Sequence, residues 1–138
     1  MGKMTSRDDV ESYLLRMGLE YEEVDDAMWV VRANGNDASI VVHYTPPVVL
    51  LRLKVMDLPT DSEDARLAPF YRRLLELNAT DILHGSYGIE ANEVILSDAL
   101  ELEDLDFSEL RSSYESMLLA ASSHTPGLAE LVPVAHEG

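Results

Sequence analysis

The stretch from Asp64 to Asn78 is the feature that most restricts how this chain can fold. It lies between two segments with strand-like alternation, and its apolar residues follow a helical spacing that covers about 160° of the surface. A helix that packs on one side needs an apolar arc of only about 100°. We therefore expect a central helix with two contacts, one to its own sheet and one to a second copy of the chain. The residues that we assign to this dimer or partner interface are Leu67, Phe70, Tyr71, Leu74 and Leu75.

The ends of this helix are marked by ordinary signals. Asp61 or Ser62 is expected to cap it, because short polar side chains accept hydrogen bonds from the first helical N–H groups. Pro69 should restrict the first turn, so that regular helix begins near this residue. Asn78 is expected to close the helix, since Asn is favoured near helix C-termini.

Period-two alternation predicts five strands around the central helix. Three of them precede it and form an antiparallel meander, in which a turn at Asn34–Asp37 follows the first strand and Pro46-Pro47 interrupts the second. A weaker extended segment at Tyr21–Val24 comes before them. The five strands are predicted at Met28–Ala33, Ile40–Thr45, Val48–Val55, Ile82–Ile89 and Val94–Leu102.

Two further helices flank the strands. One is expected from Arg7 to Met17 with Ser6 as its cap, and the other follows a capping signal at Asp106 and runs to about Ser122. The resulting order, α-β-β-β-α-β-β-α, predicts an α+β fold with helices packed on an antiparallel sheet. We expect one domain over residues 5–122 and a C-terminal tail, residues 123–138, that is partly disordered or forms one short helical turn.

Charge and composition exclude several classes of function. The chain of 138 residues has 26 acidic against 10 basic side chains, a formal charge of −16, and no cysteine. This charge opposes binding to nucleic acid and to anionic membranes, and the missing cysteines exclude disulfides and thiolate metal sites. No apolar run reaches the roughly 18 residues of a membrane span, and no signal peptide is evident, so we expect a cytoplasmic protein.

No motif for catalysis or cofactor binding is present. The four histidines, residues 43, 84, 124 and 136, lack metal-site spacing, and the chain has no P-loop, nucleophile elbow or dinucleotide fingerprint. We expect no cofactor, no metal and no enzymatic activity. His43 and His84 are interpreted as strand side chains.

Acidic and aromatic residues leave alternatives open. The runs Glu22-Glu23, Asp25-Asp26 and Glu101–Asp106 are interpreted as solvated loops, with a docking site for a basic partner as the alternative. The aromatic residues Trp29, Tyr44, Tyr71 and Tyr87 fit packing of the sheet and helices better than partner anchoring, although aromatics dominate binding hot spots.

Three segments resemble a known family: YRRLLELN from Tyr71, LHGSYGIEANEVIL from Leu83, and the capped helix from Asp106. The sequence resembles the YbjN-type family, and the order of elements resembles class I type III secretion chaperones of the Tir-chaperone-like group. The chaperones are small, acidic cytoplasmic homodimers of bacteria that hold an extended segment of a client protein, and the YbjN family is linked to regulation and stress responses. Pro69 and the tail from His124 depart from the family pattern.

The resemblance and the missing catalytic motifs together imply a non-enzymatic, chaperone-like module that holds a segment of a partner protein. The alternative is a regulator in a signalling or stress-response pathway that docks on a folded partner. Both hypotheses imply a homodimer with a protein client or regulatory partner, and no binding to nucleic acid or membrane.

Overall fold

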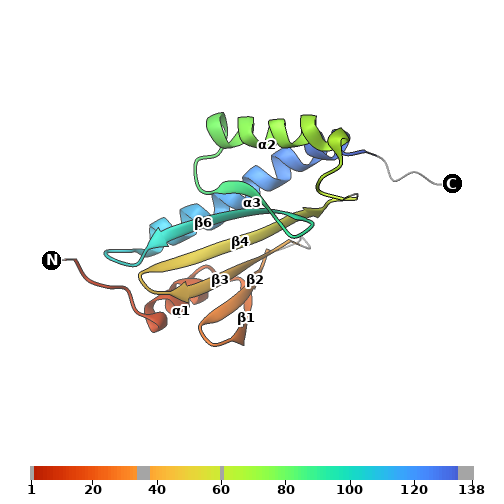
Figure 1. The fold of residues 1–138 in the computed structure, drawn as a ribbon. Coiled ribbons are helices and arrows are strands. Elements are labelled where there is room, and N and C mark those ends of the chain that lie inside the picture. Colours follow the sequence, from red (N-terminus) through yellow and green to blue (C-terminus); the bar gives the residue numbers. More distant parts are fainter. Residues whose placement is uncertain (1, 34–37, 60, 134–138) are drawn as a thin grey trace.

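The computed structural model describes residues 2–33, 38–59 and 61–133 and shows one six-stranded antiparallel sheet with three α-helices (Figure 1). The spatial order of the strands is β1-β2-β3-β4-β6-β5. The elements follow each other as α1 (Arg7–Arg16), β1 (Glu20–Asp25), β2 (Met28–Arg32), β3 (Ser39–Thr45), β4 (Val48–Asp57), η1 (Ala65–Leu67), α2 (Ala68–Thr80), β5 (Ser86–Glu90), β6 (Glu93–Glu101) and α3 (Phe107–Glu130).

The predicted α+β fold with an antiparallel sheet is confirmed, with two differences in the strands. The weak extended segment is a complete strand, β1, so four strands precede the central helix. The strand expected from Ile82 begins only at Ser86, which places His84 in a loop rather than on a strand. The turn expected at Asn34–Asp37 lies outside the described residues.

Alternation in β4 shows why the sheet has one buried face. Val49, Leu51 and Leu53 point into the core, whereas Arg52 and Lys54 point to the other side. A bulge between Lys54 and Met56 shifts the register with β6, so the alternation changes beyond it. The buried face of the sheet therefore follows directly from the apolar positions in the sequence.

Two sets of contacts hold α1 in place, one at its N-terminus and one against the sheet. Ser6 and Asp9 form a capping box in which each side chain bonds the other residue's backbone N–H. The Arg7 guanidinium lies 5.1 Å from the centre of the Trp29 ring and pairs with Glu11, at 2.8 Å, and with Glu23 on β1. These contacts hold the helix over β1 and β2, with Trp29 completely buried beneath it.

The central helix differs from its predicted ends. Asp64, not Asp61 or Ser62, supplies the N-terminal cap by accepting from the Arg66 N–H, and a 3₁₀ turn precedes α2. Regular helix begins at Ala68, beside Pro69 as expected, but continues past Asn78 to Thr80. The Asn78 side chain does not cap the helix but forms hydrogen bonds with the backbone of Tyr87 on β5.

α3 begins as predicted and ends later. Asp106 caps it by accepting from the Glu109 N–H at 2.8 Å, but the helix continues to Glu130 instead of ending near Ser122. Pro126 lies inside the helix, and Leu128 beyond it is only 1% exposed. Burial of this leucine compensates for the hydrogen bond that proline cannot donate. The division into a domain at 5–122 and a tail at 123–138 stays a prediction, and residues 123–130 are helical.

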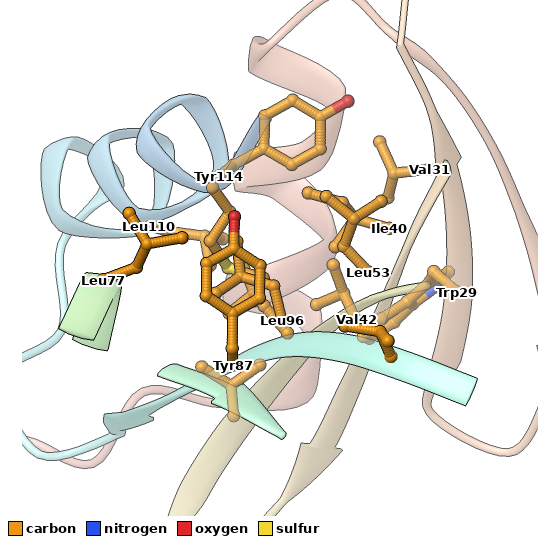
Figure 2. Close-up of a cluster of buried hydrophobic side chains, with 14 of the residues drawn as sticks. Trp29, Val31, Ile40, Val42, Leu53, Leu77, Tyr87, Leu96, Leu110 and Tyr114 are labelled. Atoms are coloured by element: carbon orange, nitrogen blue, oxygen red, sulfur yellow. The ribbon is translucent and has the colours of Figure 1, made fainter. Parts of the chain in front are cut away.

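The core lies between the sheet and the helices (Figure 2). Its largest side chains come from elements far apart in sequence: Trp29 and Ile40 from the meander, Phe70 and Leu77 from α2, and Met117 from α3. Trp29 and Tyr87 are buried, and Tyr44 and Tyr71 pack against the cluster, which supports the packing interpretation of the aromatic residues.

Candidate partner-binding surface

The five residues of the predicted interface point in different directions. Leu67, Phe70 and Leu74 lie in the core of their own chain. Tyr71 is half-buried and its hydroxyl donates to the Ser62 carbonyl at 2.6 Å, while Leu75 is 69% exposed. A single chain thus uses three of the five side chains for its own fold. Contact of Leu75 and Tyr71 with a second copy stays a prediction.

The wide apolar arc has a structural explanation. Leu67 belongs to the 3₁₀ turn and not to α2, so its side chain does not follow the 100° step on which the arc was based. Within α2, Phe70, Leu74 and Leu77 form one buried stripe, and Leu75 lies outside it. The helix therefore has one core face and one exposed leucine, instead of a continuous two-sided arc.

The junction of α2, β5 and α3 is held by polar side chains that the sequence analysis did not connect. The Tyr87 N–H donates to Asn78 Oδ1 at 2.7 Å, and Asn78 Nδ2 donates to the Tyr87 carbonyl at 3.2 Å. The Tyr87 hydroxyl lies 2.8 Å from His124 Nδ1, and His124 Nε2 lies 3.5 Å from Asp81 Oδ2. Burial raises the pKa of Tyr87 to about 12. No spacing in the sequence relates residues 37 positions apart, so this chain of contacts was not predictable.

Exposed leucines gather near this junction. Leu83, in the loop between α2 and β5, is 89% exposed, and Leu119 on α3 is 68% exposed. Both line a hollow of about 280 Å³ together with Asp81, His84 and His124. With Leu75 on α2, these side chains add apolar surface to the region in which the sequence predicts an interface.

The face of the sheet opposite α1 and α3 carries none of the described helices (Figure 1). Pairing of the strands aligns half-exposed side chains into rows across it: Val30 opposite Val41, Val41 opposite Arg52, and Arg52 opposite Ser97. The next rows place His43 opposite Leu50 and Lys54 opposite Ile95. The half-exposed apolar residues of this open sheet face are Met28, Val30, Val41, Val48, Leu50 and Ile95.

A groove of about 600 Å³ lies on the open sheet face where β4, β6 and β5 adjoin. Leu50 and Ile95 give it an apolar floor, and Arg52 lies beside them in an ion pair with Glu90. The groove thus offers apolar surface bordered by paired charges, a composition that suits the binding of a polypeptide segment.

The acidic runs do not all form loops. Glu22, Glu23 and Asp25 belong to the exposed edge strand β1, which corrects the loop interpretation for this run. In the run from Glu101 to Asp106, Leu102 and Leu105 are buried while the acidic residues stay exposed. Charged side chains on an edge strand oppose uncontrolled pairing with other chains.

Within residues 2–33, 38–59 and 61–133, no group of three or more His, Asp or Glu side chains is placed to hold a metal ion. In the same part of the chain, no helix has the length and apolar character needed to cross a membrane.

The chain matches a known protein family over most of its length. The CesT_Tir_1 profile, which describes a type III chaperone family, matches residues 3–133. The chain belongs to the CesT_Tir_1 family. A comparison with curated proteins found no significant match.

Solved structures share the CesT_Tir_1 fold with this chain. A chain of the ExoU–SpcU complex from the type III secretion system of Pseudomonas aeruginosa has a TM-score of 0.67 at 14% identity, covering 85% of this chain and 95% of its own length. The Yersinia pestis secretion chaperone SycH, in complex with a fragment of YscM2, has a TM-score of 0.61 at 16% identity, with coverages of 85% and 97%. YbjN from E. coli has a TM-score of 0.69 at 10% identity, with coverages of 92% and 96%.

These comparisons confirm the resemblance that the sequence indicated, to YbjN and to type III secretion chaperones. Identities of 10 to 16% establish the fold alone. They do not transfer individual residues, so the binding surface has to be argued from this chain's own geometry.

Proposed function

We propose that this member of the CesT_Tir_1 family is a chaperone-like, protein-binding module that holds a segment of a partner protein on its open sheet face. The observation that carries the proposal is the set of half-exposed apolar side chains in neighbouring rows of the sheet, among them Val41, Leu50 and Ile95, that none of the described helices covers. An apolar surface of this kind is a candidate site for another protein.

The charges on this face are compatible with such binding. The central cations are already paired, Arg52 with Glu90 and Lys54 with Asp57 and Glu93, so a partner need not neutralise them. The surplus negative charge of the chain favours solubility of a complex. Apolar contact, not charge, would therefore supply most of the affinity on this surface.

Two of the structural neighbours support a protein partner. SpcU is described in a heterodimeric complex with ExoU, and SycH in a complex with a stable fragment of YscM2. Both share only the fold with this chain, so neither partner is transferred to it. The absence of enzymatic activity and the cytoplasmic location belong to the same proposal, because family and fold are those of chaperones.

Homodimer formation is the second part of the proposal. The exposed Leu75, the half-buried Tyr71 and the exposed Leu83 belong to α2 and to the loop between α2 and β5. Pairing of two copies there would bury these apolar side chains and leave the open sheet face of each copy accessible.

Capture from the native cytoplasm tests the client surface. Leu50→Glu places a charge on the open sheet face, and Leu15→Glu places the same charge on an exposed leucine of α1, 67% exposed. Proteins that bind the unmodified chain and Leu15→Glu, but not a folded Leu50→Glu variant, are the expected result. If Leu50→Glu retains every partner, the open sheet face is not the binding surface.

Limited proteolysis of a captured complex separates the two functional hypotheses. A chaperone-like module should protect one short segment of its partner, because only that segment lies in the groove. A regulator that docks on a folded protein should instead retain a complete partner domain after proteolysis.

A further inference from the structure

A third hollow, called here the α1–α3 cavity, lies on the helical side of the molecule, between the segment that directly follows α1 and the middle of α3. Its volume is about 410 Å³, within the range of roughly 300–1,000 Å³ typical of ligand sites. Met17 and Leu19, Ala33 at the end of β2, and Leu118 on α3 form apolar walls. Arg111, Tyr114 and Glu115, all on α3, contribute the polar groups.

Tyr114 gives this α1–α3 cavity its most informative feature. The residue is only 3% exposed, and among the described residues its hydroxyl has no hydrogen-bond partner. Figure 2 shows the hydroxyl pointing away from Leu96 and Tyr87 in the core. An unpaired buried hydroxyl destabilises the fold, and phenylalanine would fill the same core volume without this cost. The hydroxyl therefore adds nothing to the fold that the ring does not provide.

Burial also raises the pKa of Tyr114 above its usual value of 10.0. The hydroxyl consequently keeps its proton at neutral pH and can donate a hydrogen bond to an acceptor group of a ligand. Met17 covers one side of the cavity, and its flexible side chain can move aside for a ligand at little cost.

Arg111 lines the cavity and shares an aromatic ring with Arg16, which is not one of the lining residues. Arg16 and Arg111 stack on the same ring, Phe107, with guanidinium carbons 4.0 and 5.4 Å from its centre. Arg16 has no ion-pair partner among the described residues, although the chain carries 26 acidic side chains. Arg111 lies 3.9 Å from Glu115, a distance at the limit of an ion pair between exposed groups. Stacking on Phe107 orients Arg111, the cation that lines the cavity.

We propose that the α1–α3 cavity binds an apolar side chain of a partner protein that is followed directly by a carboxylate-bearing residue. The apolar side chain lies against Met17, Leu19 and Leu118, while Tyr114 and Arg111 donate to the carboxylate and the adjoining carbonyl. The proposal rests on the proposed function only in taking the ligand from a protein. The proposal also implies that this chain, although its net charge is negative, prefers an acidic residue at one position of the partner segment.

Small peptides of matched size test the chemistry directly. The probe is acetyl-Ala-Leu-Glu-Ala-amide, and its control, acetyl-Ala-Leu-Gln-Ala-amide, differs only in replacing the carboxylate by an amide. NMR titration of the methyl-labelled full chain should show saturable shifts at Met17, Leu19 and Leu118 with the Glu peptide. The Gln peptide should bind about tenfold more weakly, the scale of a lost charge-assisted hydrogen bond.

Two variants identify the donors. Tyr114→Phe should weaken the Glu peptide several-fold while leaving the melting temperature equal or higher, because it removes an unpaired hydroxyl and keeps the ring. Arg111→Gln, at an exposed position, should reduce the difference between the Glu and Gln peptides without affecting folding. Equal binding of the two peptides, or unchanged affinity in both variants, would overturn the proposal.

A third probe distinguishes a protein segment from a small acid. N-acetyl-leucine carries the same apolar group with a free carboxylate, and N-acetyl-leucinamide is its neutral control. Binding of N-acetyl-leucine without binding of the Glu peptide would show a site for free acids or chain ends and would refute the proposed partner segment. The Leu50→Glu variant should bind the Glu peptide normally, because Leu50 lies on the open sheet face. The experiments therefore test the client site on the open sheet face and the peptide site in the α1–α3 cavity independently.

Discussion

Asn78 on α2 and Tyr87 on β5 exchange two hydrogen bonds, one from the Tyr87 N–H and one to the Tyr87 carbonyl. The side-chain amide thus pairs with β5 as the backbone of another strand would. Because Tyr87 lies on the outer strand of the sheet, the amide occupies backbone groups that would otherwise be open to other chains.

Asn78→Ala should destabilise the chain by about 1–3 kcal/mol, since it leaves two backbone groups of a buried residue unpaired. Urea unfolding measures this change. Glu76→Ala, on the exposed side of the same helix, should stay within about 0.5 kcal/mol of the unmodified chain. Equal stability of the two variants would mean that water replaces the amide at no cost.

Leu128→Ala should cost about 2–5 kcal/mol, the usual range for a fully buried leucine. Leu119→Ala is the matched control, because Leu119 lies on the same helix with 68% of its surface exposed and should change little. Thermal unfolding of both variants measures the difference. A small effect of Leu128→Ala would show that the last turns of α3 separate easily from the core.

Alkaline pH should destabilise the chain through Tyr87. Its pKa rises from 10.0 in the unfolded chain to about 12 in the folded one, so the unfolded state loses its proton first. Stability is therefore retained below pH 10 and falls as the pH increases from 10 to 12, by on the order of 2–3 kcal/mol. Urea unfolding between pH 9 and 11 should show a steeper decrease for the unmodified chain than for Tyr87→Phe. Parallel curves would contradict a folded-state shift at this residue.

Light scattering of the unmodified chain at micromolar concentration should give the mass of a dimer. Leu75→Asp should give a folded monomer, because a charge at an exposed apolar contact opposes association without disturbing the core. Leu15→Asp has nearly the same exposure on α1 and should remain dimeric. A monomer mass for the unmodified protein would refute the dimer, and aggregation of Leu75→Asp would indicate that this leucine is needed for folding.

Local patterns in the sequence were sufficient for most of the sheet. Val49, Leu51 and Leu53 alternate with polar or half-exposed neighbours, and this alternation placed the strand and its buried face correctly. Capping by Ser6 and Asp106 was likewise predictable, because the partner lies only three residues away. These features depend on residues that are close together in the sequence, and such local patterns can be recognised in a single sequence.

Predictions that depended on distant packing were less accurate. The helix that begins after Asp106 was expected to end near Ser122, but burial of Leu128 outweighs the local preference of Pro126 and carries the helix onward. The apolar arc of the central helix was overestimated because nothing in the sequence distinguishes Leu67 in a 3₁₀ turn from Leu67 in an α-helix. The α1–α3 cavity and the unpaired Tyr114 hydroxyl could not be predicted, since a cavity exists only once three elements have packed.

Trp29 is the only tryptophan of the chain, and it lies fully buried beneath α1 with the Arg7 guanidinium over its ring. Its fluorescence therefore comes from one known place in the molecule and needs no label. Exposure of the ring to water shifts indole emission to longer wavelength. The emission maximum of Trp29 therefore reports whether α1 is packed against the sheet. The protein thus carries its own optical probe for events at the helical face, independent of the open face on the other side of the sheet.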